Sequence, residues 1–403
     1  MKLLVIYRGL PWPITEGYHL RILHIFRRLA KRHDIHLLSF IQSAEQEAAL
    51  EPLKNECLFK SISLIRVPGR KLLGRALTNI GCNPVRSFHA EYPGFSLRVK
   101  KKVRELKELL QLDAGYVFDP WADLWTSEAI SELPILLDVC DCRSLYYERQ
   151  LNTGTYTFLQ RLRIKQLLRR FRGYEKNLLA TYPLSTVVSP LDKQALEQLS
   201  PKSHTEVIPN GVDLDMFAPV SNIEEEPKTL ILFGNMDFLP NYDAAIHFAK
   251  DILPLVQEKH PETKFLIVGT NPLPEVLSLS KLKGVEVTGR VPDLKEYIQR
   301  ATMLVAPMRY GAGIKNKVLE AMAVEKPVVT NSMGVEAMHP QVRKLLCVAD
   351  NNISFARHVC NLLDSPEDRK KLGKMGREAM GELHSWDSVA NSYEKLFKEL
   401  VFE

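Results

Sequence analysis

The sequence predicts an α/β protein with two parallel-sheet domains, and three observations support this prediction. The chain has 403 residues, which is too long for one ordinary hydrophobic core but suits two domains of about 200 residues each. Short apolar runs rich in β-formers alternate with helical patterns in both halves, the order that is typical of parallel sheets. The 45% apolar and 25% charged contents are those of a soluble globular protein.

The first domain is expected over residues 1–209. Its candidate strands are KLLVIY (2–7), IHLLSF (35–40), ISLIRV (62–67), AGYVF (114–118), PILLDV (134–139), STVVS (185–189) and TEVIP (205–209). A helical pattern around residues 18–32 separates the first two strands. Nearly continuous apolar runs of this length indicate strands that are buried on both faces of a sheet.

The second domain is expected over residues 229–384, where the same alternation begins again. Its candidate strands are TLILFG (229–234), KFLIVG (264–269), VEVTG (285–289), MLVAP (303–307) and PVVT (327–330), with a helix at 241–258. Residues 210–228 are turn-rich and acidic, and they lack periodicity, which predicts a linker. Residues 385–403 carry an apolar helical stripe, so this helix either closes the second domain or crosses back to the first.

We expect a cytoplasmic protein. No apolar run approaches the roughly 18 to 20 residues that a membrane-spanning helix needs. Arg8 interrupts the first apolar run after about five residues, whereas an export signal wants roughly 7 to 15. The six cysteines form no CxxC pair, which favours reduced thiols over a zinc site or a disulfide framework.

Net charge is distributed unevenly along the chain. Residues 1–200 hold 30 Lys and Arg against 20 Asp and Glu, a balance of +10, whereas residues 201–403 hold 24 against 28, a balance of −4. A basic N-terminal half indicates that this half meets something anionic.

The segment GAGIKNKVLEAMA, which starts at Gly311, combines flexible backbone, two lysines and one acid. It follows a strand candidate and leads into a helical pattern, so Gly311 and Gly313 are expected to lie in a strand-to-helix loop. Glycines let backbone N–H groups approach a ligand, and the helix N-terminus adds positive potential that Lys315 and Lys317 reinforce. Glu320 lies among apolar residues and needs hydroxyl donors, such as those of a ribose. The segment therefore indicates a nucleotide-diphosphate site; the alternative is a solvent-facing helix on which Lys and Glu only pair.

Together with the region 311–338, five further pieces of the sequence closely resemble retaining GT-B glycosyltransferases of family four. The five are PWPITEGYHLRILHIFRRLAKRHDIHLLSF (11–40), VIPNGVDLDMF (207–217), LFGNMDFLPNYDAA (232–245), FLIVGTNP (265–272) and VEVTGRVPDLKEYIQRATMLVAPMRYG (285–311). The nearest variety is the group of sugar transferases associated with exosortase (PEP-CTERM) polysaccharide clusters. The likeness is spread over most of the chain and is strongest in residues 205–340.

This resemblance implies two Rossmann-like domains that face each other across a cleft, with the acceptor largely on the N-terminal side and the nucleotide-sugar on the C-terminal side. Carried over by position, Glu320 would hold the ribose. Lys317 would hold the diphosphate and stabilise it as the leaving group. Asn316 and the Gly313 backbone would assist, beside Lys315 in the same loop.

The resemblance also implies roles for residues outside that loop. Gly234 and Asn235, at the end of the first strand of the second domain, would line the donor pocket. Val291 would lie near the base, and Arg290 would add positive charge. Gly17 would be the glycine at which the first helix closely approaches the donor phosphate or the acceptor.

The sequence departs from the family pattern at three positions. Members often have a Glu that contacts the donor sugar eight residues before the ribose Glu, and here that position is Ala312. The loop 234–241 lacks the basic residue that often meets the diphosphate, and the usual N-terminal double glycine is Glu16-Gly17. The departures leave the transferred sugar undefined. The acidic triplet 213–215 follows PNGV, where the family carries the same motif without a metal, so no metal or cofactor is expected.

The acceptor side offers one candidate residue. The family often places a His after a mid-domain strand, but this chain has LLDVCDCRS, with Asp138 and Asp141 around a strand end. Asp141 is expected to be the acceptor base or a polar contact to the acceptor, and the alternative is a helix N-cap. His19 and His24 on the first helix are expected to pack or to face solvent.

A basic helix is expected over residues 160–179, which carry seven Lys or Arg and one acid, Glu175. Such a helix can lie on an anionic membrane, and the alternative is a domain helix with a solvated basic face. Glu175 is expected to be structural. Nucleic acid is not expected as a partner, because no nucleic-acid module accompanies the charge.

The resemblance, together with the donor loop at Gly311, predicts a retaining, metal-independent glycosyltransferase of the hexosyltransferase type. It would move a sugar from a nucleotide-diphosphate sugar to a glycan or lipid-linked acceptor in polysaccharide biosynthesis, in the cytoplasm or at the inner face of the membrane. The alternatives are a nucleotide-sugar epimerase or hydrolase on the same fold, and a non-catalytic scaffold of an envelope assembly.

Overall fold

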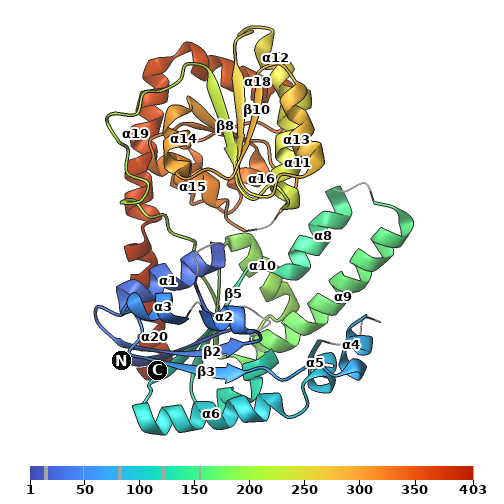
Figure 1. The fold of residues 1–403 in the computed structure, drawn as a ribbon, viewed down its shortest axis with the longest axis vertical. Coiled ribbons are helices and arrows are strands. Elements are labelled where there is room, and N and C mark those ends of the chain that lie inside the picture. The colour runs from blue at the N-terminus through green and yellow to red at the C-terminus, as the bar shows by residue number, and fades with distance from the viewer. Residues whose placement is uncertain are drawn as a thin grey trace. The chain divides into compact units, whose positions relative to one another are not determined.

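The computed structural model describes residues 1–12, 17–48, 50–79, 84–118, 124–153, 156–311 and 313–402. The chain divides into two compact units (Figure 1). Unit 1 consists of Met1–Pro209 and Val389–Glu403, and unit 2 consists of Asn210–Ser388. Both units are α/β layers around a parallel sheet, so the predicted fold class is confirmed.

Unit 1 is built on a seven-stranded sheet with the order β3-β2-β1-β4-β5-β6-β7. Its strands are β1 (Lys2–Tyr7), β2 (Asp34–Ile41), β3 (Ser61–Arg66), β4 (Ala114–Phe118), β5 (Ile135–Cys140), β6 (Leu184–Val187) and β7 (Thr205–Val207). Its helices are α1 (Gly17–Leu29), α2 (Ala44–Ala48), α3 (Leu50–Asn55), α4 (Leu72–Asn79), α5 (Pro84–Glu91), α6 (Phe95–Leu110), α8 (Arg143–Thr153), α9 (Phe158–Thr181) and α10 (Pro190–Leu199), with a 3₁₀ helix at Ser127–Ser131. All of the strand pairs are parallel, because helices or long loops return the chain between them.

Unit 2 is built on a six-stranded sheet with the order β10-β9-β8-β11-β12-β13. Its strands are β8 (Thr229–Phe233), β9 (Lys264–Val268), β10 (Val285–Gly289), β11 (Met303–Ala306), β12 (Val328–Thr330) and β13 (Cys347–Val348). Its helices are α11 (Leu239–His247), α12 (Leu253–Gln257), α13 (Pro274–Leu277), α14 (Leu294–Arg300), α15 (Asn316–Ala323), α16 (Ser332–Val335), α17 (Pro340–Arg343), α18 (Asn352–Asp364) and α19 (Pro366–Leu383), with a 3₁₀ helix at Ser278–Lys281. A π-helical turn at Phe248–Ile252 joins α11 to α12. Pro254 is the second residue after this turn and has no N–H for a regular helical bond, which explains the irregularity.

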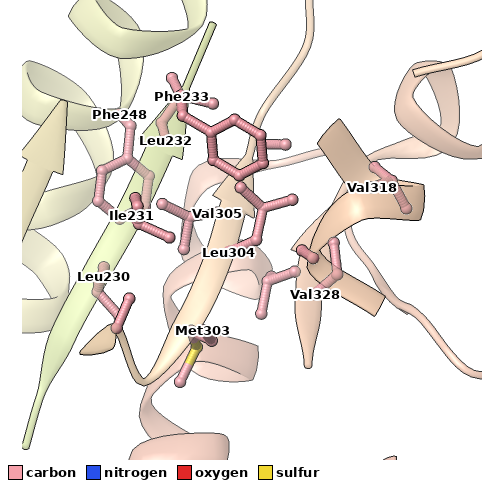
Figure 2. Close-up of a cluster of buried hydrophobic side chains, with 14 of the residues drawn as sticks. Leu230, Ile231, Leu232, Phe233, Phe248, Met303, Leu304, Val305, Val318 and Val328 are labelled. Carbon is pink, nitrogen blue, oxygen red and sulfur yellow. The ribbon is translucent and has the colours of Figure 1, made fainter. Parts of the chain in front are cut away.

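The core of unit 2 explains why the short strands form where they do. The strands β8 and β11 are buried along their whole length, and their side chains meet those of α15 and β12 (Figure 2). Phe248 packs against Phe265 with ring centroids 4.6 Å apart. Because both faces of this sheet are covered by helices (Figure 1), its strands are continuous apolar runs rather than alternating ones.

Residues 210–228, which were expected to link the domains, are part of unit 2. Glu226 accepts a hydrogen bond from the Arg300 side chain at 2.8 Å, and the amide of Val220 donates to Gln299 at 2.9 Å. Helix α20 (Trp386–Phe402) begins in unit 2 and continues into unit 1 from Val389. Of the two alternatives for the helix at residues 385–403, the structure therefore has the one in which it crosses back to the first domain.

A buried polar network holds α20 in unit 1. Asp138 on β5 accepts hydrogen bonds from Arg21 Nε at 2.8 Å, from the Tyr116 hydroxyl at 2.6 Å and from the Tyr393 hydroxyl at 2.6 Å. Arg21 also donates to the Tyr393 oxygen at 2.6 Å, and to the carbonyl of Ile208 at 2.9 Å. Arg21 and Asp138 are fully buried, so every charge in this network needs its partner.

Candidate active site

The strand order of the unit 2 sheet singles out one place where a ligand crevice is expected. The chain runs from β8 through β9 to β10 on one side and then returns to β11 on the other side of β8. In parallel sheets, ligands bind beyond the carboxyl ends of the strands at such a reversal. The two loops that leave this point are residues 234–238 after β8 and residues 307–315 after β11, and both carry predicted donor residues.

The loop after β8 is shaped by a close approach at Gly234. This residue has φ 144°, and a Cβ there would lie 2.6 Å from Nδ2 of Asn241. Asn241 is buried near the start of α11, where its Nδ2 donates to the carbonyl of Asn235 at 2.9 Å. The Asn235 side chain accepts a hydrogen bond from the Thr270 hydroxyl at 3.2 Å. Glycine is therefore required at position 234 for the loop to pack on Asn241.

Lys317 contacts this same asparagine from α15. Its ammonium donates a hydrogen bond to Oδ1 of Asn241, although the two residues are 76 positions apart in the chain. Burial lowers the pKa of Lys317 to about 7, and nearby Glu320 raises it in part. Asn241 thus joins the two loops of the crevice and holds the lysine, a role that sequence reasoning missed. The residue lies within the family-like piece 232–245, but nothing local marks its partner.

The start of α15 is open to an anion. Lys315 precedes the helix and provides no side-chain cap for its first amides. Its ammonium donates to the carbonyl of Gly313 at 2.9 Å, and its side chain is buried. Asn316 accepts a hydrogen bond from Nδ2 of Asn210 at 3.0 Å. Gly311 and Gly313, with φ of 110° and 66°, form the bend before the helix. Position 312 lies outside the described residues.

Glu320 lies one helical turn after Lys317, and its carboxylate is half-buried. Burial raises its pKa to about 7, and Lys317 lowers it in part. Within the described residues, neither a hydrogen bond nor an ion pair satisfies this carboxylate, and no ion pair joins it to Lys317. The alternative of a solvent-facing helix with a simple Lys–Glu pair is therefore wrong. A carboxylate in this position can accept hydrogen bonds from a ligand.

The other predicted donor residues of unit 2 lie at the same edge of the sheet but farther from the crevice. Arg290 is exposed and Val291 is half-buried, in the loop after the edge strand β10. Val291 packs against the hydrophobic core of unit 2. An ion pair that the sequence did not predict lies nearer. Arg309, in the loop after β11, binds Asp243 on α11 through two hydrogen bonds of 2.9 and 2.6 Å.

In unit 1 the corresponding reversal of strand order lies between β1 and β4. The loops that leave it include residues 13–16 and 119–123, which lie outside the described residues, and so does Glu16 of the predicted Glu16-Gly17 pair. Gly17 is the first residue of α1. His24 on the same helix is buried, and the ring of His19 contacts Tyr7 with centroids 6.0 Å apart, so both histidines pack.

Asp141 lies at the carboxyl end of β5 and is exposed. The residue before it, Cys140, has φ 64°, a backbone conformation that costs a non-glycine residue energy. The amide of Cys142 donates to buried Asp192 at 2.9 Å. The next amide, of Arg143, donates to buried Glu175 at 2.8 Å, as does that of Ser144 at 3.3 Å. The first amides of α8 therefore bond to these two buried carboxylates.

Burial also perturbs the two supporting carboxyls. It raises the pKa of Asp192 to about 7, and the nearby negative charge of Asp141 adds to the increase. It raises the pKa of Glu175 as well, against the hydrogen bonds that this carboxyl accepts. Glu175 holds the start of α8, a structural role that agrees with the sequence prediction. Asp213 of the acidic triplet accepts the amides of Asp215 and Met216 at 3.1 and 2.9 Å, which makes it the cap of a turn.

Comparison with known proteins finds a family model that matches the part of the chain that contains this site. Residues 227–365 match the family model for "Glycosyl transferases group 1". A "Putative glycosyltransferase EpsD" of Bacillus subtilis (strain 168) is 28% identical over 201 residues, 45% of this chain and 52% of that protein. An "Uncharacterized 44.6 kDa protein in cps region" of Klebsiella pneumoniae is 20% identical over 99% of both chains.

Solved structures match over the whole length. A glycosyltransferase from Rickettsia africae superposes with a TM-score of 0.70 at 14% identity, covering 100% of this chain and 99% of that one. Anabaena HepE in complex with UDP superposes with a TM-score of 0.68 at 13% identity, covering 99% and 100%. These likenesses establish the fold, and the family model and the curated relative establish the enzyme class. The chain is a glycosyltransferase whose residues 227–365 match the group 1 family model and whose fold is that of GT-B structures.

Proposed function

We propose that this enzyme is a retaining, metal-independent glycosyltransferase that moves a sugar from a nucleotide-diphosphate sugar to a glycan or lipid-linked acceptor. We place it in polysaccharide biosynthesis, in the branch that resembles the exosortase-associated transferases. Anabaena HepE, which shares the fold, has been solved with UDP and with UDP-glucose. The relatives from a Klebsiella cps region and from Bacillus support the polysaccharide context.

One observation carries the donor assignment. The half-buried Glu320 carboxylate has no hydrogen-bond or ion-pair partner in the described chain, and it lies one turn from the buried Lys317 at an uncapped helix start. A buried charge that the protein leaves unsatisfied destabilises the free protein, so a ligand that completes it binds there favourably. Ribose hydroxyls would donate to Glu320, and a diphosphate would accept from Lys317 and the first amides of α15.

The same groups account for the chemistry. Cleavage of the bond between sugar and phosphate develops negative charge on the departing diphosphate. Lys317, Lys315 and the helix start would stabilise that charge, because they are fixed in place before the reaction. Gly234 and Asn235 would line the donor pocket, with Arg290 and Val291 beyond them. A metal ion is not required in this scheme, because these groups supply the positive charge.

The acceptor would meet unit 1. Asp141 is the candidate base or polar contact, because the strained turn at Cys140 presents its carboxylate at the carboxyl end of β5. Gly17, at the first turn of α1, remains the candidate for the glycine at which this helix closely approaches the donor phosphate or the acceptor. We also propose that residues 160–179 contact an anionic membrane surface and that the enzyme works at the inner face of the membrane. In the described chain, no helix is both long and apolar enough to span a bilayer.

Calorimetry with UDP, GDP and ADP tests the donor assignment. We expect one of the three to bind, and Lys317→Ala to weaken it by about 2–4 kcal/mol, because a desolvated charge partner is removed. Lys281→Ala is the matched control, since Lys281 is exposed and lies in the same unit. If the wild-type protein binds none of the three nucleotides, the donor assignment fails. Epimerised or free sugar formed without any acceptor would favour the epimerase or hydrolase alternative.

A further inference from the structure

Helix α9 presents two unlike faces. Its buried face consists of Ile164, Phe171, Tyr174, Glu175, Leu178 and Leu179. The opposite face, at spacings of three and four residues, consists of Phe158, Leu162, Lys165, Arg169, Arg172 and Lys176, all of them exposed. The helix lies beside α8, and its N-terminal end projects away from the sheet of unit 1 (Figure 1).

The projecting end of α9 is apolar. Phe158 is 75% exposed, Leu159 75% and Leu162 48%. We call these three residues the α9 tip. The helix begins with a complete capping box between Thr157 and Gln160, so the tip is helical from its first residue. Three large apolar side chains exposed together on one helical turn indicate an interaction surface rather than chance exposure.

The exposed surface of α9 beyond the tip is basic. Lys165, Arg169 and Lys176 lie on the exposed face defined above, and Arg161 and Arg163 are exposed on other sides of the first turns. We call these five residues the α9 cation stripe. None of these five has an ion-pair partner among the residues that the structure describes, whereas Arg172 pairs with Glu148 at 2.8 Å. The acid of this helix, Glu175, is on the buried face. The stripe is therefore a positive surface that its own protein does not neutralise.

We propose that the α9 tip and the α9 cation stripe dock the enzyme on a bilayer that contains anionic phospholipid. Lys165 follows Phe158 by seven residues, which is about 10 Å along the helix axis. An interfacial helix buries its apolar part about 5–10 Å into the headgroup region. Insertion of the tip to that depth leaves the near end of the stripe, Arg161, Arg163 and Lys165, close to the phosphates, where each cation gains attraction to anionic lipid. The more distant cations of the stripe add longer-range attraction to the same surface.

The composition of the surface favours a bilayer over other occupants. A second copy of the chain would bring a second basic stripe against the first, and like charges repel. A nucleic acid would satisfy the stripe but would leave the two leucines of the tip in water. A bilayer satisfies both, because its headgroups are anionic and its interior is apolar.

This proposal deepens the proposed function, since a transferase docked in this way meets an acceptor that is carried on a lipid. Docking itself does not require sugar transfer or donor binding. The two proposals can therefore fail separately, because vesicle binding and nucleotide binding are measured independently.

Vesicle co-sedimentation of the full chain tests the docking surface. The probes are vesicles of phosphatidylcholine alone and of phosphatidylcholine mixed with phosphatidylglycerol. We expect binding to the mixed vesicles only, weakened by added salt because ions screen the stripe. The triple variant Phe158→Ser, Leu159→Ser, Leu162→Ser and the double variant Lys165→Glu, Arg169→Glu should each bind at least about tenfold more weakly.

Helix α6 of the same unit offers matched controls. Leu97 and Leu109 are 60% and 77% exposed, so the double change of these leucines to Ser repeats the loss of apolar surface. Arg98→Glu with Lys101→Glu, two exposed positions, repeats the charge change of the stripe variant. Both controls should bind vesicles within about twofold of wild type. All variants should keep the melting temperature, because the altered side chains are exposed.

Three outcomes would overturn the proposal. The first is no binding to anionic vesicles by the wild-type chain. The second is equal loss in the α6 controls, which would mean that net charge alone attracts the protein. The third is binding to single-stranded RNA or DNA that both α9 variants abolish while vesicle binding survives, which would assign the surface to nucleic acid.

Discussion

The paired pKa values of Lys317 and Glu320 predict that donor affinity has a maximum near pH 7. In the free protein both groups titrate at about 7, the lysine lowered by burial and the glutamate raised by burial. The proposed complex needs Lys317 charged against the diphosphate and Glu320 ionised to accept ribose hydroxyls. Binding should therefore take up a proton above pH 7 and release one below it.

The size of the effect follows from the linkage. Above pH 7 the free Lys317 is mostly neutral, so the affinity should fall by about tenfold, or about 1.4 kcal/mol, per pH unit. Below pH 7 the free Glu320 is mostly protonated, and the affinity should fall by the same factor per unit in the other direction. Lys317→Met should remove the alkaline limb, and Glu320→Gln should remove the acid limb. Each variant should bind more weakly at pH 7.

The assay is calorimetry with the nucleotide-sugar that binds, repeated in buffers of different ionisation enthalpy. A nucleotide-sugar is preferable to a free nucleotide diphosphate, because a terminal phosphate titrates by itself near a pH of about 6. We expect an uptake of about one proton at pH 8 and a release of about one at pH 6. A flat affinity profile, or an alkaline limb that persists in Lys317→Met, would refute the reasoning.

Three further predictions test the packing around the two sites. Gly234→Ala should weaken nucleotide binding by at least about tenfold, because the new Cβ would displace Asn241, which holds Lys317. An unchanged affinity in calorimetry would contradict this prediction. Tyr393→Phe should lower the free energy of unfolding by about 2 kcal/mol in denaturant titrations, because it removes a hydrogen bond to a buried carboxylate. Asp138→Asn should lower it by more, about 3–5 kcal/mol, because it leaves a buried guanidinium without its counter-charge. Equal effects of the two variants would argue against the ionic network. Asp141→Asn should slow transfer to the acceptor while nucleotide affinity stays at the wild-type value, and a loss of nucleotide binding would remove Asp141 from the acceptor side.

The elements of the fold could be predicted from the sequence because each depends on a local pattern. The strands of both sheets follow from apolar runs, except for β13, whose two residues at a sheet edge are too few to give a period. The helix predicted at 241–258 exists, but its π-helical turn follows from the position of Pro254 and not from hydrophobic spacing. The sequence stripe of α20 could not specify which unit it packs against, because an apolar face is compatible with any apolar surface.

The site could be predicted in part. Glycines, lysines and a lone acid in one loop indicated a ligand for the start of α15, because these features are local and chemically unusual. The contact between Lys317 and Asn241 could not be predicted, since it joins residues 76 positions apart and depends on the order of strands in the sheet. The same holds for the contact of Asp138 with Tyr393, which spans 255 positions. Glu175 is the one acid among residues 160–179 of a basic helix, which indicates a structural role, but its bonds to the first amides of α8 depend on tertiary contacts that the sequence does not show.

Burial of charge has opposite consequences in the two units, and the difference lies in the partners. In unit 1 the buried carboxylate of Asp138 accepts hydrogen bonds from three side chains of the same unit, so its charge stabilises the docking of α20. In unit 2 the ammonium of Lys317 has a neutral amide as its partner, and Glu320 has none among the described residues. These two groups destabilise the free protein, since burial disfavours their charged forms and shifts both pKa values towards neutrality. A chain retains such a cost where a ligand removes it, which makes an unsatisfied charge, rather than a buried one, the feature that distinguishes the binding site from the structural network.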